Sequence, residues 1–179
     1  MGLDAGRFVA FSTLGVLSVT QDLAGAILED VVGADPELVA EETLCLVATA
    51  TARAAEVALR EHPSIAELAA SALIDIPFIY RDYLLGSEML RRHESTLAEL
   101  GDEIYARLQR KREFYAVHFP PGQFPGERTL TDKMGLWMGR ISPPKLPELP
   151  TERLEKLELV DTLLRHLKLV RAYGGRGKE

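Results

Sequence analysis

Residues 33–63, GADPELVAEETLCLVATATARAAEVALREHP, decide the fold of this 179-residue chain. The stretch opens with Asp35, Pro36 and Glu37, which suit the cap, the first position and the first turn of a helix. Apolar residues then recur every three or four positions as far as Glu61, a spacing that predicts one helix. Seven of the apolar residues between Pro36 and Glu61 are alanines, which let neighbouring helices approach closely. We therefore expect a closely packed helix here, ended by the His62-Pro63 pair.

The segment before this helix is the most apolar part of the chain. Residues 8–28 are long enough to cross a membrane, but Gln21 and Asp22 interrupt them and the basic flank is only Arg7. Spanning helices usually carry stronger apolarity and a cationic end. Small residues fill much of the stretch, which suits close packing between helices. We therefore expect a buried helix and no membrane span.

Two shorter elements are expected after residue 63. Ser64 and Glu67 form a capping-box pattern, Ser-Ile-Ala-Glu, which predicts the start of a short helix. Pro77 then separates this helix from the apolar segment 78–85.

From Ser87 to about His118 the pattern predicts one long amphipathic helix, roughly 45 Å in length at 1.5 Å per residue. Such a helix is longer than a compact core of this size needs, so we expect part of it to pack on a second subunit. The candidate association stripe consists of apolar residues at helical spacing, namely Leu90, Leu97, Ile104 and Leu108. The sequence therefore predicts a homo-oligomer.

Seven of the ten prolines lie between residues 120 and 150, and proline-rich stretches resist helix formation. Between the two proline clusters, Thr131-Asp132 can cap a helix of about two turns. We interpret residues 119–150 as an ordered arm with Phe124, Trp137 and Met138 as its anchors. The arm lies either across its own bundle or on a neighbouring subunit.

Thr151 is expected to cap a final helix that ends by Tyr173, and residues 174–179 to form a flexible tail. No stretch shows the two-residue alternation of a strand. The sequence therefore predicts an all-α bundle of five to six helices with one long amphipathic helix and a proline-rich arm. We divide it into a bundle (1–118), the arm with a short helix (119–150), a C-terminal bundle helix (151–173) and the tail.

Composition and charge narrow the class of protein. The chain is 46% apolar and 27% charged, with a net charge of −6, which fits one globular domain. Its single cysteine, Cys45, excludes a disulfide framework and a multi-cysteine metal cluster. Residues 1–75 carry 12 acidic and 3 basic side chains, so a surface for nucleic acid would have to lie further along. No signal peptide is recognisable, and we expect a cytoplasmic protein.

Familiar catalytic and metal-binding motifs are missing from the sequence. None of the four histidines has a glutamate three residues before it, and His-Glu-x-x-His does not occur. Neither Gly-x-Ser-x-Gly nor a phosphate-binding glycine loop occurs. Cys45 lies on an alanine-rich apolar helix, which is typical of a buried thiol. We therefore expect no metal, no cofactor and, on balance, no enzyme.

Arg112 and His118 form the one pattern with catalytic potential. The segment Arg112-Glu-Phe-Tyr-Ala-Val-His118 resembles the motif of HEPN-type helical ribonucleases, in which four to six residues separate an arginine from a histidine. The resemblance implies metal-free RNA cleavage, with His118 as acid or base and Arg112 holding the phosphate. Residues six apart on a helix point about 120° away from each other. The two side chains therefore converge only if the helix breaks before Pro120 or two subunits meet. The alternative is an exposed arginine and a histidine at a helix end.

Residues 64–83 resemble a helix-turn-helix of the tetracycline-repressor type. The apolar positions of that motif are occupied, and a common aromatic position is matched, by Ile65, Leu68, Ala69, Ala72, Ile74, Ile79 and Tyr80. The resemblance implies DNA binding, for which Arg81, Arg107, Arg110 and Lys111 are the candidate cations. The alternative is a buried helical hairpin with solvated cations.

The interpretation that fits these patterns best is a non-enzymatic helical interaction or scaffold protein. It would act through self-association and through a protein partner that the sequence does not identify. The alternatives are a helix-turn-helix-like regulator that binds nucleic acid and, after it, a HEPN-like ribonuclease that needs no metal.

Overall fold

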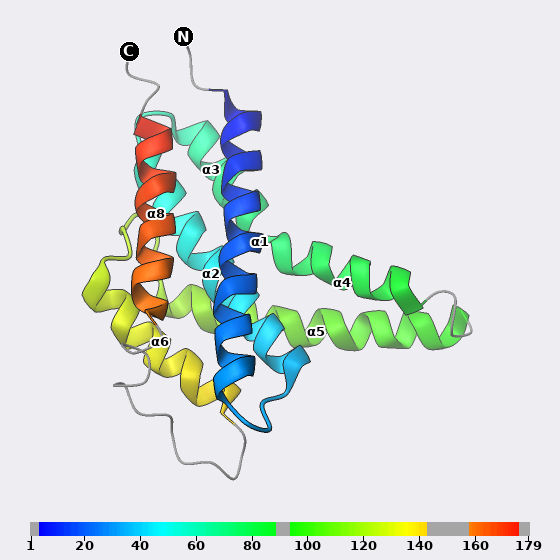
Figure 1. The fold of residues 1–179 in the computed structure, drawn as a ribbon. Helices are drawn as coiled ribbons and strands as arrows, with labels where there is room; N and C mark the ends of the chain where they lie inside the picture. Colours follow the sequence, from blue (N-terminus) through cyan, green and yellow to red (C-terminus); the bar gives the residue numbers. More distant parts are fainter. Residues whose placement is uncertain (1–3, 89–93, 143–157, 176–179) are drawn as a thin grey trace.

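The computed structural model describes residues 4–88, 94–142 and 158–175, and within these ranges it holds helices and no strands. The helices are α1 (Ala5–Asp30), α2 (Pro36–Ala58), α3 (Pro63–Ile74), α4 (Ile76–Glu88), α5 (Glu94–His118), α6 (Glu127–Ile141) and α8 (Leu159–Gly175) (Figure 1). Only Asp75 separates α3 from α4, so the described residues hold six helices when these two count as one bent helix. The predicted all-α bundle is confirmed.

Helix α2 is the centre of the bundle. Every residue from Glu41 to Ala55 is buried, and α1, α3, α4, α5, α6 and α8 all contact it. The predicted start is confirmed, because the Asp35 side chain accepts hydrogen bonds from the backbone N–H groups of Glu37 and Leu38 at 2.9 and 3.2 Å. The alanines explain the position, because small side chains on all faces let six helices approach one axis.

Helices α1 and α8 lie side by side and run in opposite directions (Figure 1). Gly174, near the end of α8, is buried, and a Cβ atom there would lie only 2.8 Å from Cβ of Ala58 and 3.1 Å from the ring of Phe8. The predicted tail is therefore wrong at residues 174–175, which belong to α8, and residues 176–179 lie outside the described part.

The start of α3 differs from the prediction. The helix begins at Pro63, its N-cap residue is His62, and no side chain caps it, so the Ser64–Glu67 capping box does not form. The physical reason is that proline is pre-organised for the first helical position, where its missing N–H is not needed. Pro77 lies in the first turn of α4, and the predicted break between the two elements is confirmed.

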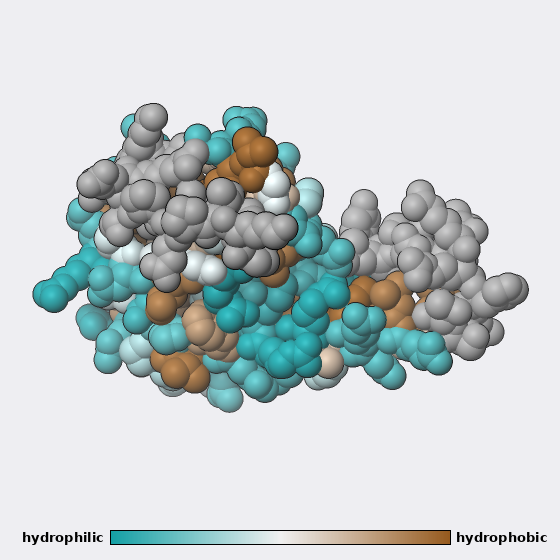
Figure 2. Space-filling model, turned by 90° about the horizontal axis from the view of Figure 1, so that it is seen from below, coloured by the Kyte–Doolittle hydropathy of each residue, from teal (hydrophilic) through white to brown (hydrophobic). Residues whose placement is uncertain are grey.

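The helix predicted from Ser87 to His118 is shorter in the structure. Ser87 belongs to the end of α4, and α5 starts at Glu94. Helices α4 and α5 pack along each other and project from the bundle (Figures 1 and 2). Helix α5 has 25 residues, or about 37 Å. The outer part of α5 is thus covered by α4 of the same chain.

The proline-rich arm contains a longer helix than expected. Helix α6 starts at Glu127, with Gly126 as its N-cap, and not at Thr131-Asp132. Its 15 residues span about four turns and pack on α2 and α8. Thr131 lies inside the helix, where its hydroxyl donates to the Glu127 carbonyl oxygen at 3.0 Å. The predicted cap at Thr151 lies outside the described residues.

Candidate functional site

Two adjacent carboxylates on α2, those of Glu41 and Glu42, are the most deeply buried charges in the described residues. Each residue is only 1% exposed. A buried carboxylate is costly unless it is paired and hydrogen-bonded. Its partners therefore show what holds this part of the bundle together.

Glu41 binds two cations of α5. Arg107 donates from Nη2 to Oε1 at 2.6 Å and from Nε to Oε2 at 2.9 Å, and Lys111 donates from Nζ to Oε2 at 2.5 Å. Arg107 also contacts Glu37 at 2.5 Å. The hydrogen bond to Glu41 raises the pKa of Arg107 further above its usual range. These contacts fix α5 against α2.

Glu42 is held by α6 and α5 together. Arg140 donates to both of its oxygens at 2.7 Å, and the Tyr115 hydroxyl donates to Oε2 at 2.8 Å. Burial and the Glu42 charge raise the pKa of Tyr115 well above 10. Burial likewise raises the pKa of Cys45, with Glu42 adding to the effect. The thiol is therefore protonated and buried, as the sequence predicted, and is unsuited to act as a nucleophile.

We call these six residues (Glu41, Glu42, Arg107, Lys111, Tyr115 and Arg140) the charge cluster. The oxygens of both carboxylates accept hydrogen bonds from named donors, and these donors lie on three turns of α5 and one of α6. The cluster joins α2, α5 and α6 through hydrogen bonds to both buried carboxylates.

Three of the four cations predicted to contact nucleic acid are paired with carboxylates. Arg107 and Lys111 belong to the charge cluster, and Lys111 is buried. Arg81 donates to Asp82 at 2.8 and 2.5 Å and lies over the ring of Tyr105. Arg110 alone of the four is exposed with no ion pair in the described residues. The four cations therefore do not form one basic surface.

The helix pair that resembles a helix-turn-helix differs from that motif at its joint. The two helices of such a motif are joined by a turn of three to four residues. Here Asp75 alone joins α3 to α4, and Leu73, near the position of the turn, is fully buried.

Arg112 and His118, the candidate ribonuclease pair, have separate surroundings. Arg112 contacts Asp75 at 3.3 Å and lies over the ring of Phe78. His118 packs edge-on against Phe114, and burial together with the charge of Lys133 lowers its pKa. Helix α5 does not break between them, so they lie on different sides of it. Arg112 and His118 therefore do not form one site.

Two of the four residues of the predicted association stripe are buried in the core of the bundle. Ile104 and Leu108 are core residues, with exposures of 4% and 0%, and Leu97 is half-buried. Leu90 lies outside the described residues. Ile104 and Leu108 therefore offer no surface to a second subunit, because α2 and α4 already cover this helix.

The arm anchors lie on their own bundle. Trp137 and Met138 are buried, and Trp137 Nε1 donates to the Thr43 hydroxyl at 3.2 Å. Phe124 is half-buried beneath the guanidinium of Arg171, at 4.5 Å from its ring centre.

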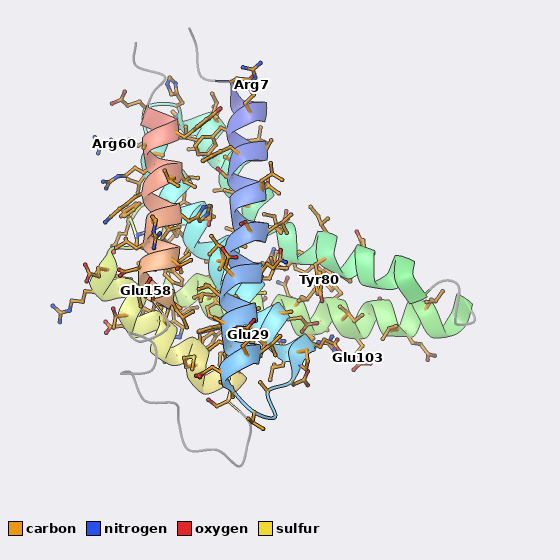
Figure 3. The ribbon with its side chains drawn as sticks, viewed as in Figure 1. Arg7, Glu29, Arg60, Tyr80, Glu103 and Glu158 are labelled. Atoms are coloured by element: carbon orange, nitrogen blue, oxygen red, sulfur yellow. The ribbon has the colours of Figure 1, made fainter. Side chains whose placement is uncertain are left out.

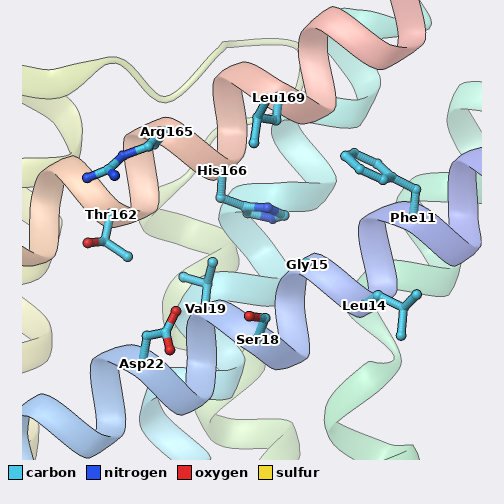
Figure 4. Close-up of a pocket in the computed structure, with 10 residues that line it drawn as sticks. All are labelled: Phe11, Leu14, Gly15, Ser18, Val19, Asp22, Thr162, Arg165, His166 and Leu169. Atoms are coloured by element: carbon cyan, nitrogen blue, oxygen red, sulfur yellow. The ribbon is translucent and has the colours of Figure 1, made fainter.

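A cleft of about 560 Å³ lies between α1 and α8 (Figure 4). Phe11, Leu14, Val19 and Leu169 supply apolar walls. Its polar groups come from both helices and are Ser18, Asp22, Thr162, Arg165 and His166. The Phe11 ring stacks on the Tyr173 ring, with 4.6 Å between the two ring centres. This pair lies at one end of the contact between α1 and α8.

His166 lies at the base of this cleft and is neutral. Thr51 donates to the Val47 carbonyl oxygen at 2.7 Å, so its hydroxyl oxygen accepts from His166 Nε2–H at 3.0 Å. Burial lowers the pKa of His166 to about 4. The ring also lies against Gly15, where a Cβ atom would be 2.3 Å from ring atom Cε1. The histidine therefore holds α8 to α2 and α1 in its uncharged form.

The outward side of α1 is the feature that sequence reasoning missed. Its core side is buried, but Leu14, Leu17 and Leu28 are 68%, 49% and 39% exposed. Together with the exposed residues Ala10 and Gln21 they lie on the side of the helix opposite its buried residues. We call these five residues the α1 face. The expectation of a fully buried helix is therefore wrong, because α1 packs on its neighbours along one side only.

Two helical stretches, Ala5–Asp30 and Pro63–Asp82, are long and apolar enough to cross a membrane by length and composition, and one third of each apolar window is buried in the bundle. Within the described residues, no group of three or more histidine, cysteine, aspartate or glutamate side chains could hold a metal ion. No protein-family model, curated protein or solved structure matches the chain.

Proposed function

We propose that the protein is a non-enzymatic interaction subunit that self-associates through the α1 face. The observation that carries this proposal is the exposure of Leu14 and Leu17 on a helix side without charge. From Phe8 to Gln21, fourteen residues, α1 carries no charged side chain. Leucines scattered singly over a surface are ordinary, but an uncharged helix side with leucines at helical spacing is typical of an interface.

The state of the polar groups supports a binding role over catalysis. Both carboxylates of the charge cluster are saturated with donors, and the Cys45 thiol and the Tyr115 hydroxyl are buried with raised pKa values. Arg112 and His118 have different neighbours. The candidate chemistry of the sequence is thus used to hold helices together.

Native mass tests the proposal. At micromolar concentration, light scattering on a sizing column should give a multiple of 19.8 kDa for the wild-type protein. The double variant Leu14→Glu, Leu17→Glu should give 19.8 kDa. Each subunit would bring two charges into the interface, and charges cannot be buried there without partners. Covering both leucines contributes about 2–4 kcal/mol per subunit, enough to shift the association strongly.

Leu68→Glu is the matched control, because Leu68 is also exposed, at 61%, but lies on α3. This variant should keep the wild-type mass. All three proteins should unfold at similar urea concentrations when compared as monomers. A wild-type protein that stays at 19.8 kDa and sediments with lipid vesicles would instead show that a bilayer covers the α1 face.

A further inference from the structure

We infer that the cleft between α1 and α8 binds a free amino acid with a large apolar side chain, its ammonium group beside Asp22 and its carboxylate on Arg165. The inference goes beyond the proposed function, because the residues that line the cleft belong to one chain. Three observations carry it: the separation of polar and apolar groups along the cleft, the opposite charges at its polar end, and an acceptor of His166 without a donor.

The cleft has a polar end and an apolar end. Asp22, Thr162 and Arg165 lie toward one end, whereas Phe11 and Leu14 lie toward the other (Figure 4). A ligand that fills such a cleft needs an apolar body and a polar head group. The volume of about 560 Å³ lies within the range of small-molecule sites.

The polar end carries one charge of each sign. Of the charged residues on α1, Arg7 and Glu29 lie near opposite ends of the helix (Figure 3), and Asp22 lines the cleft. On α8, Arg165 lines it. Both side chains are exposed, and neither forms an ion pair within the described residues. A head group with one positive and one negative charge can pair with both, whereas a head group of one sign would meet a like charge.

His166 adds an acceptor at the base of the cleft. The residue is 6% exposed, and its Nε2–H donates to Thr51, so Nδ1 carries a lone pair. Gly15 leaves the Nδ1–Cε1 edge of the ring without a covering side chain, and no described residue donates to Nδ1. The Ser18 hydroxyl, which also lines the cleft, has no partner in the same part of the chain. A primary ammonium group has three N–H donors, enough for Nδ1, Ser18 and Asp22.

An amino acid with a large apolar side chain carries the three groups that these walls require. Its side chain would lie against Phe11 and Leu14, and its ammonium group would donate to His166 and Asp22. Its carboxylate would bind Arg165, because a guanidinium group can hold a carboxylate through two parallel hydrogen bonds. Leu14 also belongs to the α1 face, so this site borders the surface of the proposed self-association.

Calorimetric titration of the full chain at pH 7 tests the inference. L-Phenylalanine should bind with a Kd of about 10 μM to 1 mM, as expected for a ligand of its size. Three matched probes each lack one group: glycine lacks the apolar side chain, phenethylamine the carboxylate and hydrocinnamate the ammonium group. Each should bind at least about tenfold more weakly. A protein that does not bind L-phenylalanine, or that binds any of the three probes as tightly, would overturn the inference.

Substitutions in the cleft locate the bound ligand. Arg165→Gln and Asp22→Asn should each raise the Kd about five- to twentyfold, because each removes a charge-assisted hydrogen bond. Lys168→Gln and Glu29→Gln are the matched controls, since they remove exposed charges of the same sign from the same helices outside the cleft. These controls should keep the wild-type Kd, and all four variants should unfold at similar urea concentrations. An unchanged Kd in Arg165→Gln and Asp22→Asn would place the ligand elsewhere and overturn the inference.

Discussion

Lowering the pH should destabilise the protein through His166. The ring is buried and its Nε2–H donates to Thr51, and burial lowers its pKa from 6.5 to about 4. The charged groups that line the cleft beside it are Asp22 on α1 and Arg165 on α8. In the unfolded chain the imidazole returns to a pKa near 6.5. The unfolded state therefore binds the proton more tightly than the folded state.

The sign and size of the effect follow from proton linkage. The stabilisation from the neutral ring is fully present above pH 6.5 and is lost as the pH falls toward 4, the pKa of the folded state. Between pH 7 and pH 5 this loss amounts to about 2 kcal/mol, and it approaches about 3 kcal/mol below pH 4. Most carboxylates titrate below pH 5, so the interval from 7 to 5 reports mainly on histidines.

Urea unfolding at pH 7, 6 and 5 measures this loss in the wild-type protein and in His166→Gln. Glutamine is of similar size and does not titrate, so its stability should change by less than about 0.5 kcal/mol over the interval. His118→Gln is the control and should keep most of the wild-type slope, because His118 is only half-buried. An equal slope in the wild-type protein and His166→Gln would refute the assignment of His166 as a buried neutral group.

Three further substitutions test the packing. Gly15→Ala should destabilise the folded protein by about 1–3 kcal/mol, because the new methyl group meets the His166 ring. Its control, Gly25→Ala, should be neutral or stabilising, and thermal unfolding of the monomeric proteins compares the two variants. Glu42→Ala should lower the free energy of unfolding in urea by about 3–5 kcal/mol, since it removes the buried partner of Arg140 and Tyr115. Glu37→Ala, at a half-exposed ion pair, should lower it by less than about 1 kcal/mol. Trp137→Ala should cost about 3–5 kcal/mol through loss of a fully buried side chain, against less than about 1 kcal/mol for the exposed Leu136→Ala.

The sequence predicted a helix correctly where residues close together in the chain determine it. Asp35 and Pro36 predicted the start of α2, and its alanines predicted close packing against neighbouring helices, because capping and side-chain size are properties of the local sequence. The boundary between α4 and α5 was missed, because apolar residues recur at helical spacing in the sequence on both sides of it. The pattern of α5 also gave no sign that α4 of the same chain would cover it.

The α1 face and the charge cluster were harder to predict, for physical reasons. In α1 nearly every residue between Phe8 and Gln21 is apolar or small, so hydropathy could not distinguish the buried side from the exposed one. In the sequence, Glu41 and Glu42 look like solvent-exposed charges. Their burial is explained by ion pairs with Arg107 and Arg140, which lie on helices distant in the sequence. The absence of charge between Phe8 and Gln21 was visible in the sequence and is the signal that could have located the exposed α1 face.

The most direct test of self-association through the α1 face is the native mass measured over a range of protein concentrations. Light scattering from 1 to 100 μM, with absorbance at 260 and 280 nm, follows self-association and any bound nucleic acid together. We expect the wild-type mass to shift from 19.8 kDa toward twice that value with a protein spectrum, and the mass of Leu14→Glu, Leu17→Glu to stay at 19.8 kDa. A wild-type mass of 19.8 kDa throughout would contradict it, as would excess 260 nm absorbance that disappears in high salt.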